Sequence, residues 1–379
     1  MHYAGRYEAS NIELEKAERL REELYTHSLT KEAASLLTSE NVKPYRGDDF
    51  EDVLINYYKA LNYLYLNKRE DALVELRRAD EKLAYLNLHY EHKNVYRSDA
   101  FMEFLSGVFH EMGGEYNDAL VSYRRALESY EDYRKFYGLE PPEFLIKRLL
   151  LAAKLSEIYE VYEEISSRFP GIEPASREKG LLIVILECGQ MPGKKEDFVE
   201  IPVREKNDTY IVRVAFSYYE PSPIPVVSAA LLADNLQAEL RTMEDIQAIA
   251  IKNLEDKKAR EIAKATLRAT AKYLAYRKAR EETEKYARKK KKSDEEAELL
   301  GLIVGKLVNI FTYTTERADT RSWLGLPQTI MVGYMELDPG SYIPELRVRK
   351  RNGSYQTLSF PTITLQSGEI KILSRRMFN

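Results

Sequence analysis

The feature that most constrains the fold of this 379-residue chain is a change in the spacing of its apolar residues. Up to about residue 168, apolar positions recur every three or four residues, which is typical of amphipathic helices. After Phe169, Pro170 and Gly171 the apolar positions alternate, which is typical of strands. The sequence therefore predicts an α+β protein with a helical domain over residues 1–170 and a β-rich domain over residues 171–379.

The helical domain has the residue pattern of tetratricopeptide-like (TPR-like) repeats, in which Ala72 and Ala119 hold equivalent places. Small residues let paired helices approach, and stacked pairs then share one core. Many of the 28 tyrosines lie in this domain. They are either packing residues with a solvated hydroxyl or part of a concave surface that grips an extended peptide. On the second interpretation, the candidate partner-binding residues are Tyr63, Tyr116 and Tyr123.

The β-rich domain is predicted to be an antiparallel β-sandwich. Residues 181–186 form a continuous apolar run, which suits a central strand buried on both faces. Residues 198–203 and 210–216 are predicted to pair as a hairpin. Asn352-Gly353 predicts a second hairpin with a type I′ turn, since that turn needs positive φ at both central positions.

A long helical insertion at about residues 242–322 is predicted to interrupt this sandwich. Residues 251–292 contain 16 Lys and Arg against 6 Asp and Glu, a local net charge of +10 in a chain whose net charge is −4. Such asymmetry indicates contact with an anionic surface or with an acidic neighbour. Lys289 and Lys290 begin a lysine run that is predicted to be exposed, and they are candidate contacts. A second helix at about 294–312, with Gly301 and Gly305, is predicted to lie close to its neighbour.

The segment 316–327 returns the chain from the insertion to a strand and holds the single tryptophan, Trp323. A structural role predicts that Asp319 and Arg321 form an ion pair while Trp323 fills the space between helices and sheet. The other interpretation is a partner-contact site.

The sequence predicts no catalytic residue, no metal site and no cofactor. The β-rich domain has no histidine, so it cannot hold a Ser-His-Asp triad alone. Cys188 ends an apolar run and is predicted to be a buried small side chain. His89 and His92 lack an evident third metal ligand. All five histidines precede residue 111: His2, His27, His89, His92 and His110.

The chain is predicted to have no transmembrane segment, because its longest apolar run, residues 299–313, contains Lys306 and is too short to span a bilayer. The first residues do not have the pattern of a signal peptide.

Two segments carry a family resemblance. Residues 316–323 (ERADTRSW) with Leu326-Pro327, followed by residues 336–342, resemble the C-terminal signature of an uncharacterised family of bacterial envelope lipoproteins. That family also begins with tetratricopeptide-like helices, similar to residues 56–63 and 105–107 here. The resemblance implies a periplasmic-side location, a lipid anchor on an N-terminal cysteine of the native precursor, and no established enzymatic activity. This chain departs from the pattern, since it has no lipobox and its one cysteine lies in a predicted strand.

These observations favour a non-enzymatic interaction or scaffold protein of the bacterial envelope that binds a peptide or protein partner through its helical repeats. Two alternatives remain open. One is an envelope enzyme that acts on the cell wall with a site between the domains. The other is a binder of polyanions or membrane surfaces that acts through residues 251–292.

Overall fold

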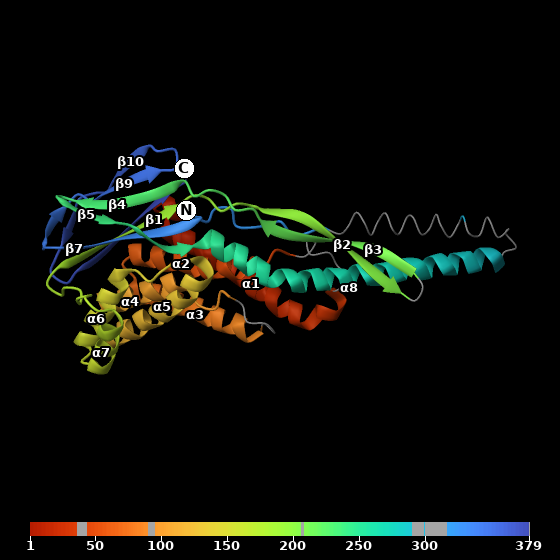
Figure 1. The fold of residues 1–379 in the computed structure, drawn as a ribbon, viewed down its shortest axis with the longest axis horizontal. Helices are drawn as coiled ribbons and strands as arrows, with labels where there is room; N and C mark the ends of the chain where they lie inside the picture. The colour runs from red at the N-terminus through yellow and green to blue at the C-terminus, as the bar shows by residue number, and fades with distance from the viewer. Residues whose placement is uncertain (36–43, 90–94, 206–207, 290–298, 300–316, 379) are drawn as a thin grey trace.

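The computed structural model describes residues 1–35, 44–89, 95–205, 208–289, 299 and 317–378, and it shows a mixed α+β protein. Helices come first and strands follow, so the predicted order is confirmed at this level (Figure 1). After a 3-10 helix (His2–Ala4), the helices are α1 (Tyr7–Ser35), α2 (Asp49–Tyr65), α3 (Arg69–His89), α4 (Ala100–Met112), α5 (Tyr116–Tyr137), α6 (Glu143–Leu155), α7 (Tyr159–Arg168) and, between strands, α8 (Ile246–Lys289).

Local signals set the helix ends. The backbone N–H of Asp48 donates to Glu51 Oε2 at 3.1 Å at the start of α2, which is half of a capping box. At the start of α4, Asp99 Oδ1 accepts from the backbone N–H of Met102 at 2.9 Å. Helix α5 ends at Gly138, whose φ of 69° favours glycine. Helices α2 to α7 then pack one after another along the chain.

The strands form two larger sheets and two smaller pairs. One four-stranded sheet has the order β12-β1-β7-β6 and the other β10-β9-β4-β5, while β8 pairs with β11 and β2 with β3. The strands are β1 (Gly180–Cys188), β2 (Lys194–Glu205), β3 (Asp208–Tyr219), β4 (Val226–Ala233), β5 (Leu236–Glu239), β6 (Arg241–Asp245), β7 (Thr329–Leu337), β8 (Gly340–Tyr342), β9 (Glu345–Lys350), β10 (Tyr355–Ser359), β11 (Ile363–Leu365) and β12 (Ile370–Met377).

Strand β1 is buried on both faces, as predicted. Successive side chains of a strand point to opposite faces, so alternate residues enter two different cores. Ile183 and Ile185 pack into the core shared with the helices. Val184 and Leu186 pack into a second core shared with β4 and β9 of the other sheet. The β1 sheet thus lies between the helices and the second sheet.

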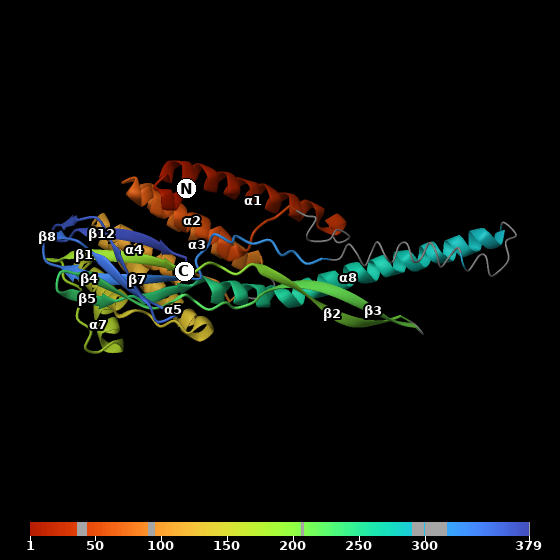
Figure 2. The ribbon, with the colours of Figure 1, turned by 90° about the horizontal axis from the view of Figure 1, so that it is seen from above.

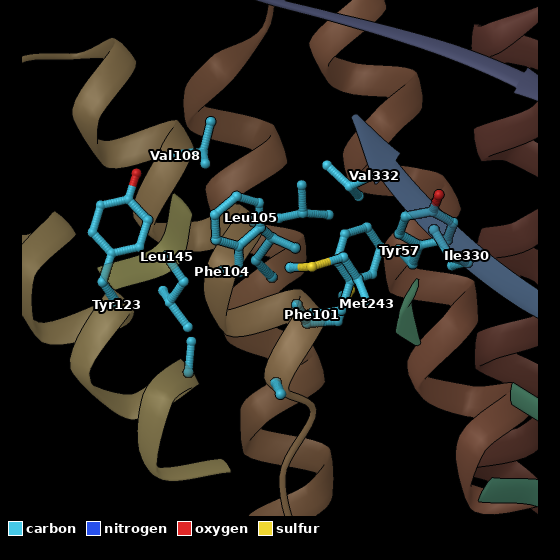
Figure 3. Close-up of a cluster of buried hydrophobic side chains, with 14 of the residues drawn as sticks. Tyr57, Phe101, Phe104, Leu105, Val108, Tyr123, Leu145, Met243, Ile330 and Val332 are labelled. Carbon is cyan, nitrogen blue, oxygen red and sulfur yellow. The ribbon is translucent and has the colours of Figure 1, made fainter. Parts of the chain in front are cut away.

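The core between the helices and the β1 sheet is continuous (Figure 3). Phe101, Phe104 and Leu105 of α4 meet Ile330 and Val332 of β7 there. This core crosses the predicted domain boundary at residue 170, and the division into two domains stays a prediction.

The strand pairing corrects two details of the predicted sandwich. Strand β12 pairs with β1 in parallel, with Ile183 opposite Ile372, so the pairing is not antiparallel throughout. The long connection from β1 to β12 allows this, because a parallel pair needs a crossover of many residues between its strands. Residues 242–245 belong to β6, which pairs with β7, so the inserted helix α8 begins at Ile246 and not at Thr242.

The predicted hairpins are both present. Strands β2 and β3 pair antiparallel along their whole length, and β9 pairs antiparallel with β10. In the second turn only Gly353 has a positive φ, at 84°, so the turn is not type I′. The backbone N–H of Lys350 donates to the Ser354 carbonyl at 2.8 Å, which closes a longer loop with Gly353 in the left-handed conformation.

Helix α8 and the β2–β3 hairpin lie side by side and extend away from the rest of the molecule in both views (Figures 1 and 2). We refer to β2, β3 and α8 as the arm, and to the remaining helices and sheets as the body. The helix predicted at 294–312, with Gly301 and Gly305, lies outside the described residues. Within the part of the chain that the structure describes, no helix has both the length and the apolar character needed to cross a membrane.

Candidate functional site: the basic arm and its junction with the body

The tyrosines predicted to bind a partner lie at different depths. Tyr123 is fully buried, packs against Gly107 of α4, and donates its hydroxyl to Glu111 Oε2 at 2.8 Å. A Cβ at Gly107 would lie 2.4 Å from the Tyr123 ring, so the small residue is what allows α4 and α5 to approach. Tyr123 is therefore a packing residue in this structure and not a surface contact. Tyr63 and Tyr116 are partly exposed, and their role in binding stays a prediction.

The face of α4 that looks towards the sheets is not open to a peptide. Its apolar side chains are covered by the sheet, and Phe101 lies beside Met243 of β6 (Figure 3). The sequence did not reveal this, because the pattern of an apolar helix face is the same whether a neighbouring sheet or a partner covers it.

An acidic group at the N-terminus of α2 contacts the hairpin, α8 and the described segment that leads into β7. We refer to Asp48, Asp49 and Glu51 as the acidic anchor. Lys194 of β2 pairs with Asp48 at 2.7 Å. Lys257 of α8 pairs with Asp49 at 2.8 Å. Acidic side chains at a helix N-terminus are also favoured by the helix dipole. The anchor thus ties the hairpin and α8 to one point of the body.

Glu51 of the anchor holds the segment that leads back into β7. It is almost fully buried, and it accepts hydrogen bonds from the Trp323 backbone N–H at 2.8 Å and from the Tyr45 hydroxyl. Burial, followed by the nearby charge of Asp48, raises the pKa of Glu51. The sequence does not reveal this contact, because nothing in the local pattern before α2 shows that residues far along the chain return to it.

The predicted ion pair between Asp319 and Arg321 is present. Arg321 donates Nε–H to Asp319 Oδ1 at 2.8 Å and Nη2–H to Oδ2 at 2.7 Å. Burial opposes ionisation of Asp319, but the hydrogen bonds from Arg321 outweigh it and lower the pKa of Asp319. Trp323 packs partly into the shared core, with its ring 5.8 Å from that of Tyr58. These contacts fit the structural interpretation, and a role in partner contact stays open.

Beside this junction lies an open polar hollow of about 240 Å³, lined by Glu196 and residues 317–321. The backbone N–H of Ala318 donates to Glu196 Oε1 at 2.6 Å, which joins the junction to β2. The carboxylate of Asp319 is already satisfied by Arg321, so the hollow presents no convergent reactive pair.

The arm has a small apolar core of its own. Val214 of β3 and Ala265 of α8 are buried against each other, with Ile201 and Ile262 packed partly around them. A cation lies over an aromatic ring in two places: Lys258 Nζ is 4.0 Å from the centre of the Phe216 ring, and the Arg213 guanidinium is 3.8 Å from that of Phe198.

The outer face of α8 combines apolar and basic side chains. Leu267 and Leu274 are 65% and 41% exposed. Since Leu267 is two residues from Ala265, it points away from the hairpin at 3.6 residues per turn. The exposed Lys278, Lys285 and Lys289 follow on the same side, together with Glu282. Lys289 is thus exposed at the end of α8, as predicted, while Lys290 lies outside the described residues.

A second group that the sequence did not reveal lies beside the base of the arm, where α4 and α5 meet β6. Tyr133 donates its hydroxyl to Glu244 at 3.1 Å, and Tyr96 donates to Asp99 Oδ2 at 2.7 Å. Burial raises the pKa of Asp99 to about 6, raises the pKa of Glu103 to about 8, and raises that of Glu244 well above its usual range. These carboxyl groups are buried inside the body, so their raised pKa values reflect packing and do not mark an accessible site.

The described residues offer little for metal or thiol chemistry. His110, Glu115 and Asp118 have ligand atoms within 4.8 Å of one another, but Arg69 also pairs with Glu115 at 2.8 Å. A guanidinium at that distance opposes a bound cation. Cys188 is fully buried, as predicted, and burial raises the pKa of its thiol to about 12.

Comparison of the chain with family models, with curated proteins and with solved structures finds no match.

Proposed function

We propose that this chain is a non-enzymatic interaction protein of the bacterial envelope, in which the body is a support of TPR-like helices and a sandwich-like pair of sheets. The arm carries the main contact with an acidic protein partner. The observation that carries the proposal is the outer face of α8, where two exposed leucines lie in line with exposed lysines.

The arm has the form of a contact element. It extends beyond the body, and its own core is small, so its length contributes little to packing of the body (Figures 1 and 2). Exposed apolar side chains beside a surplus of charges of one sign are typical of a surface that docks an amphipathic partner of opposite charge. This moves the predicted contact from the repeat tyrosines, of which Tyr123 is buried, to the arm.

Location in the envelope rests on the resemblance of residues 316–342 to the lipoprotein family, and it is part of the proposal. A second candidate function is binding to an anionic membrane surface through the same lysines. The basic character of α8 favours it: Ile246–Lys289 contains 13 Lys and Arg against 6 Asp and Glu.

Photo-crosslinking in the source cells tests the proposal. A photoreactive amino acid replaces Lys285 on the arm or, as the matched control, the exposed Lys154 on the body. We expect a discrete protein adduct from position 285 and none of that size from position 154. A protein adduct from position 154 alone would place the contact on the body. Crosslinks from position 285 to lipid alone would favour the membrane alternative.

A further inference from the structure

Helix α1 sits on the body with its polar side inward. Among its described side chains, Ser10, Asn11 and Glu18 are buried, at 7%, 8% and 5% exposed. Ile12 and Leu20 are 57% and 58% exposed. A surface helix normally buries its apolar side, so α1 reverses the usual arrangement. Apolar burial therefore makes up only part of the contact between α1 and the body.

The surface beneath α1 is also polar. Asn56, Lys59 and Asn62 are spaced by three along α2, which puts them on one side of that helix, and they are at most 1% exposed. Asn62 donates to Asn11 Oδ1 at 2.8 Å, and its own Oδ1 lies 2.6 Å from the His2 ring. Helix α1 covers this stripe together with α3, from which Glu75 accepts a hydrogen bond from Asn56 at 2.7 Å and pairs with Lys59 at 3.0 Å.

Charge complementarity sets the position of α1. Lys59 Nζ lies 2.8 Å from Glu15 and 2.7 Å from Glu18 of α1. Lys82 of α3 reaches Glu18 as well. Burial opposes the charge on Lys59, but the hydrogen bonds that Lys59 donates to Glu15 and Glu18 outweigh it and raise the pKa of Lys59.

A buried ion cluster of this kind determines which helix can bind the α2–α3 face more than it stabilises the fold. The cost of removing charges from water offsets most of their attraction, so a buried ion cluster adds little net stability compared with apolar packing. The fit is also incomplete: Nδ2 of Asn11 is buried without a hydrogen-bond partner. Apolar contact is modest. Leu14 packs against the core, and the centre of the Tyr7 ring lies 5.0 Å from that of Tyr65.

We propose that the α2–α3 face around Lys59 and Lys82 is a docking site for an acidic helix of a protein partner, and that α1 occupies this site until the partner displaces it. The partner helix carries two acidic residues three positions apart, as Glu15 and Glu18 are, with an amide side chain one turn earlier, as Asn11 is. This site is separate from the arm, and the inference does not depend on the function proposed for the arm.

Fluorescence anisotropy on the full chain tests the site. The probe is a labelled peptide with the sequence of residues 7–24. Glu15→Gln with Glu18→Gln in the chain weakens its own α1, so this variant should bind the probe at least about tenfold tighter than the wild type, in which α1 competes. Glu13→Gln is the control, because Glu13 is exposed and pairs with Lys16 within α1.

The added change Lys59→Gln should abolish probe binding, and a probe with both glutamates replaced by glutamine should not bind. Equal affinity of the double variant and the wild type, or no binding by a double variant with unchanged circular dichroism, would overturn the proposal. Formation of dimers by exchange of α1 would identify a second copy as the occupant and contradict a separate partner.

Hydrogen exchange on the unmodified chain gives an independent test. Amides of residues 7–24 should exchange faster than those of α2, through an opening that leaves the rest of the body protected. Exchange of α1 only through global unfolding would rule out displacement.

Discussion

The body and the arm are held together in different ways. In the body, β1 alone fills two cores, with Ile183 on one side and Val184 on the other. Beyond its base, the buried core of the arm is little more than Val214 against Ala265. At the base, Ile246 and Ile249 of α8 pack into the core of the body, and charged contacts with the acidic anchor add to this packing. The difference indicates that the body provides stability, while the arm is free to use its surface for contact.

The largest expected effect is a loss of stability when a buried side chain of the body is shortened, compared with the same change in the arm. Ile183→Ala should destabilise the body by about 4 kcal/mol, because it leaves a cavity in a closed core. The chemically matched change Ile201→Ala in the arm should lower the free energy of global unfolding by no more than about 1 kcal/mol, since Ile201 is only partly buried. Urea unfolding measures both. Similar losses would mean that the arm and the body share one cooperative core.

Asp48→Asn should loosen the base of the arm without unfolding the body. Lys194 is 6% exposed at its side chain, and the change leaves its charge without its closest partner, at a cost of about 2 kcal/mol. Hydrogen exchange should therefore accelerate in β2 and β3 but not in β1. If β1 accelerated equally, the anchor would be part of the folding core.

The body should lose stability as pH rises from 5 to 8. Glu103 has a folded pKa of about 8, well above the usual 4.3, so the folded chain holds its proton more tightly than the unfolded chain. Its contribution is complete below the unfolded pKa and is lost as pH rises through the folded pKa. Asp99, with a pKa of about 6, acts in the same direction.

The loss between pH 5 and pH 8 should be on the order of 4 kcal/mol, and Glu103→Gln should remove most of it. Chemical unfolding of both proteins at several pH values measures the difference. The acidic range below pH 4 is avoided, because the lowered pKa values of Glu18 and Glu115, both about 2, act in the opposite sense there. If the stability of the two proteins changed equally with pH, Glu103 would not be the cause of the loss.

Arg321→Ala should have the smallest effect, about 0.5 kcal/mol, because the pair with Asp319 is partly exposed and lies within one segment. Thermal unfolding checks this value. A variant that folds normally but loses a protein partner would overturn the structural interpretation of the junction and make it a contact site.

The sequence predicted what local pattern determines. It gave the helices before residue 170, the central strand over 181–186 and the hairpin of β2 with β3, because periodicity and turn residues are local. It left open whether Tyr123 packs or binds a partner, and it did not give the parallel pairing of β12 or the acidic anchor, since each depends on segments that are distant in the chain. Asp48 and Glu51 look like an ordinary helix start until Lys194 and Trp323 are seen to reach them.

The most direct test of the arm as the contact surface is capture of partners from envelope extracts with three forms of the full chain. One is the wild type, one carries Lys278→Glu, Lys285→Glu and Lys289→Glu, and the matched control carries Arg134→Glu, Lys154→Glu and Arg347→Glu at exposed positions of the body. We predict that a protein captured by the wild type and by the body variant is lost from the arm variant. Capture by the arm variant and loss from the body variant would contradict the account.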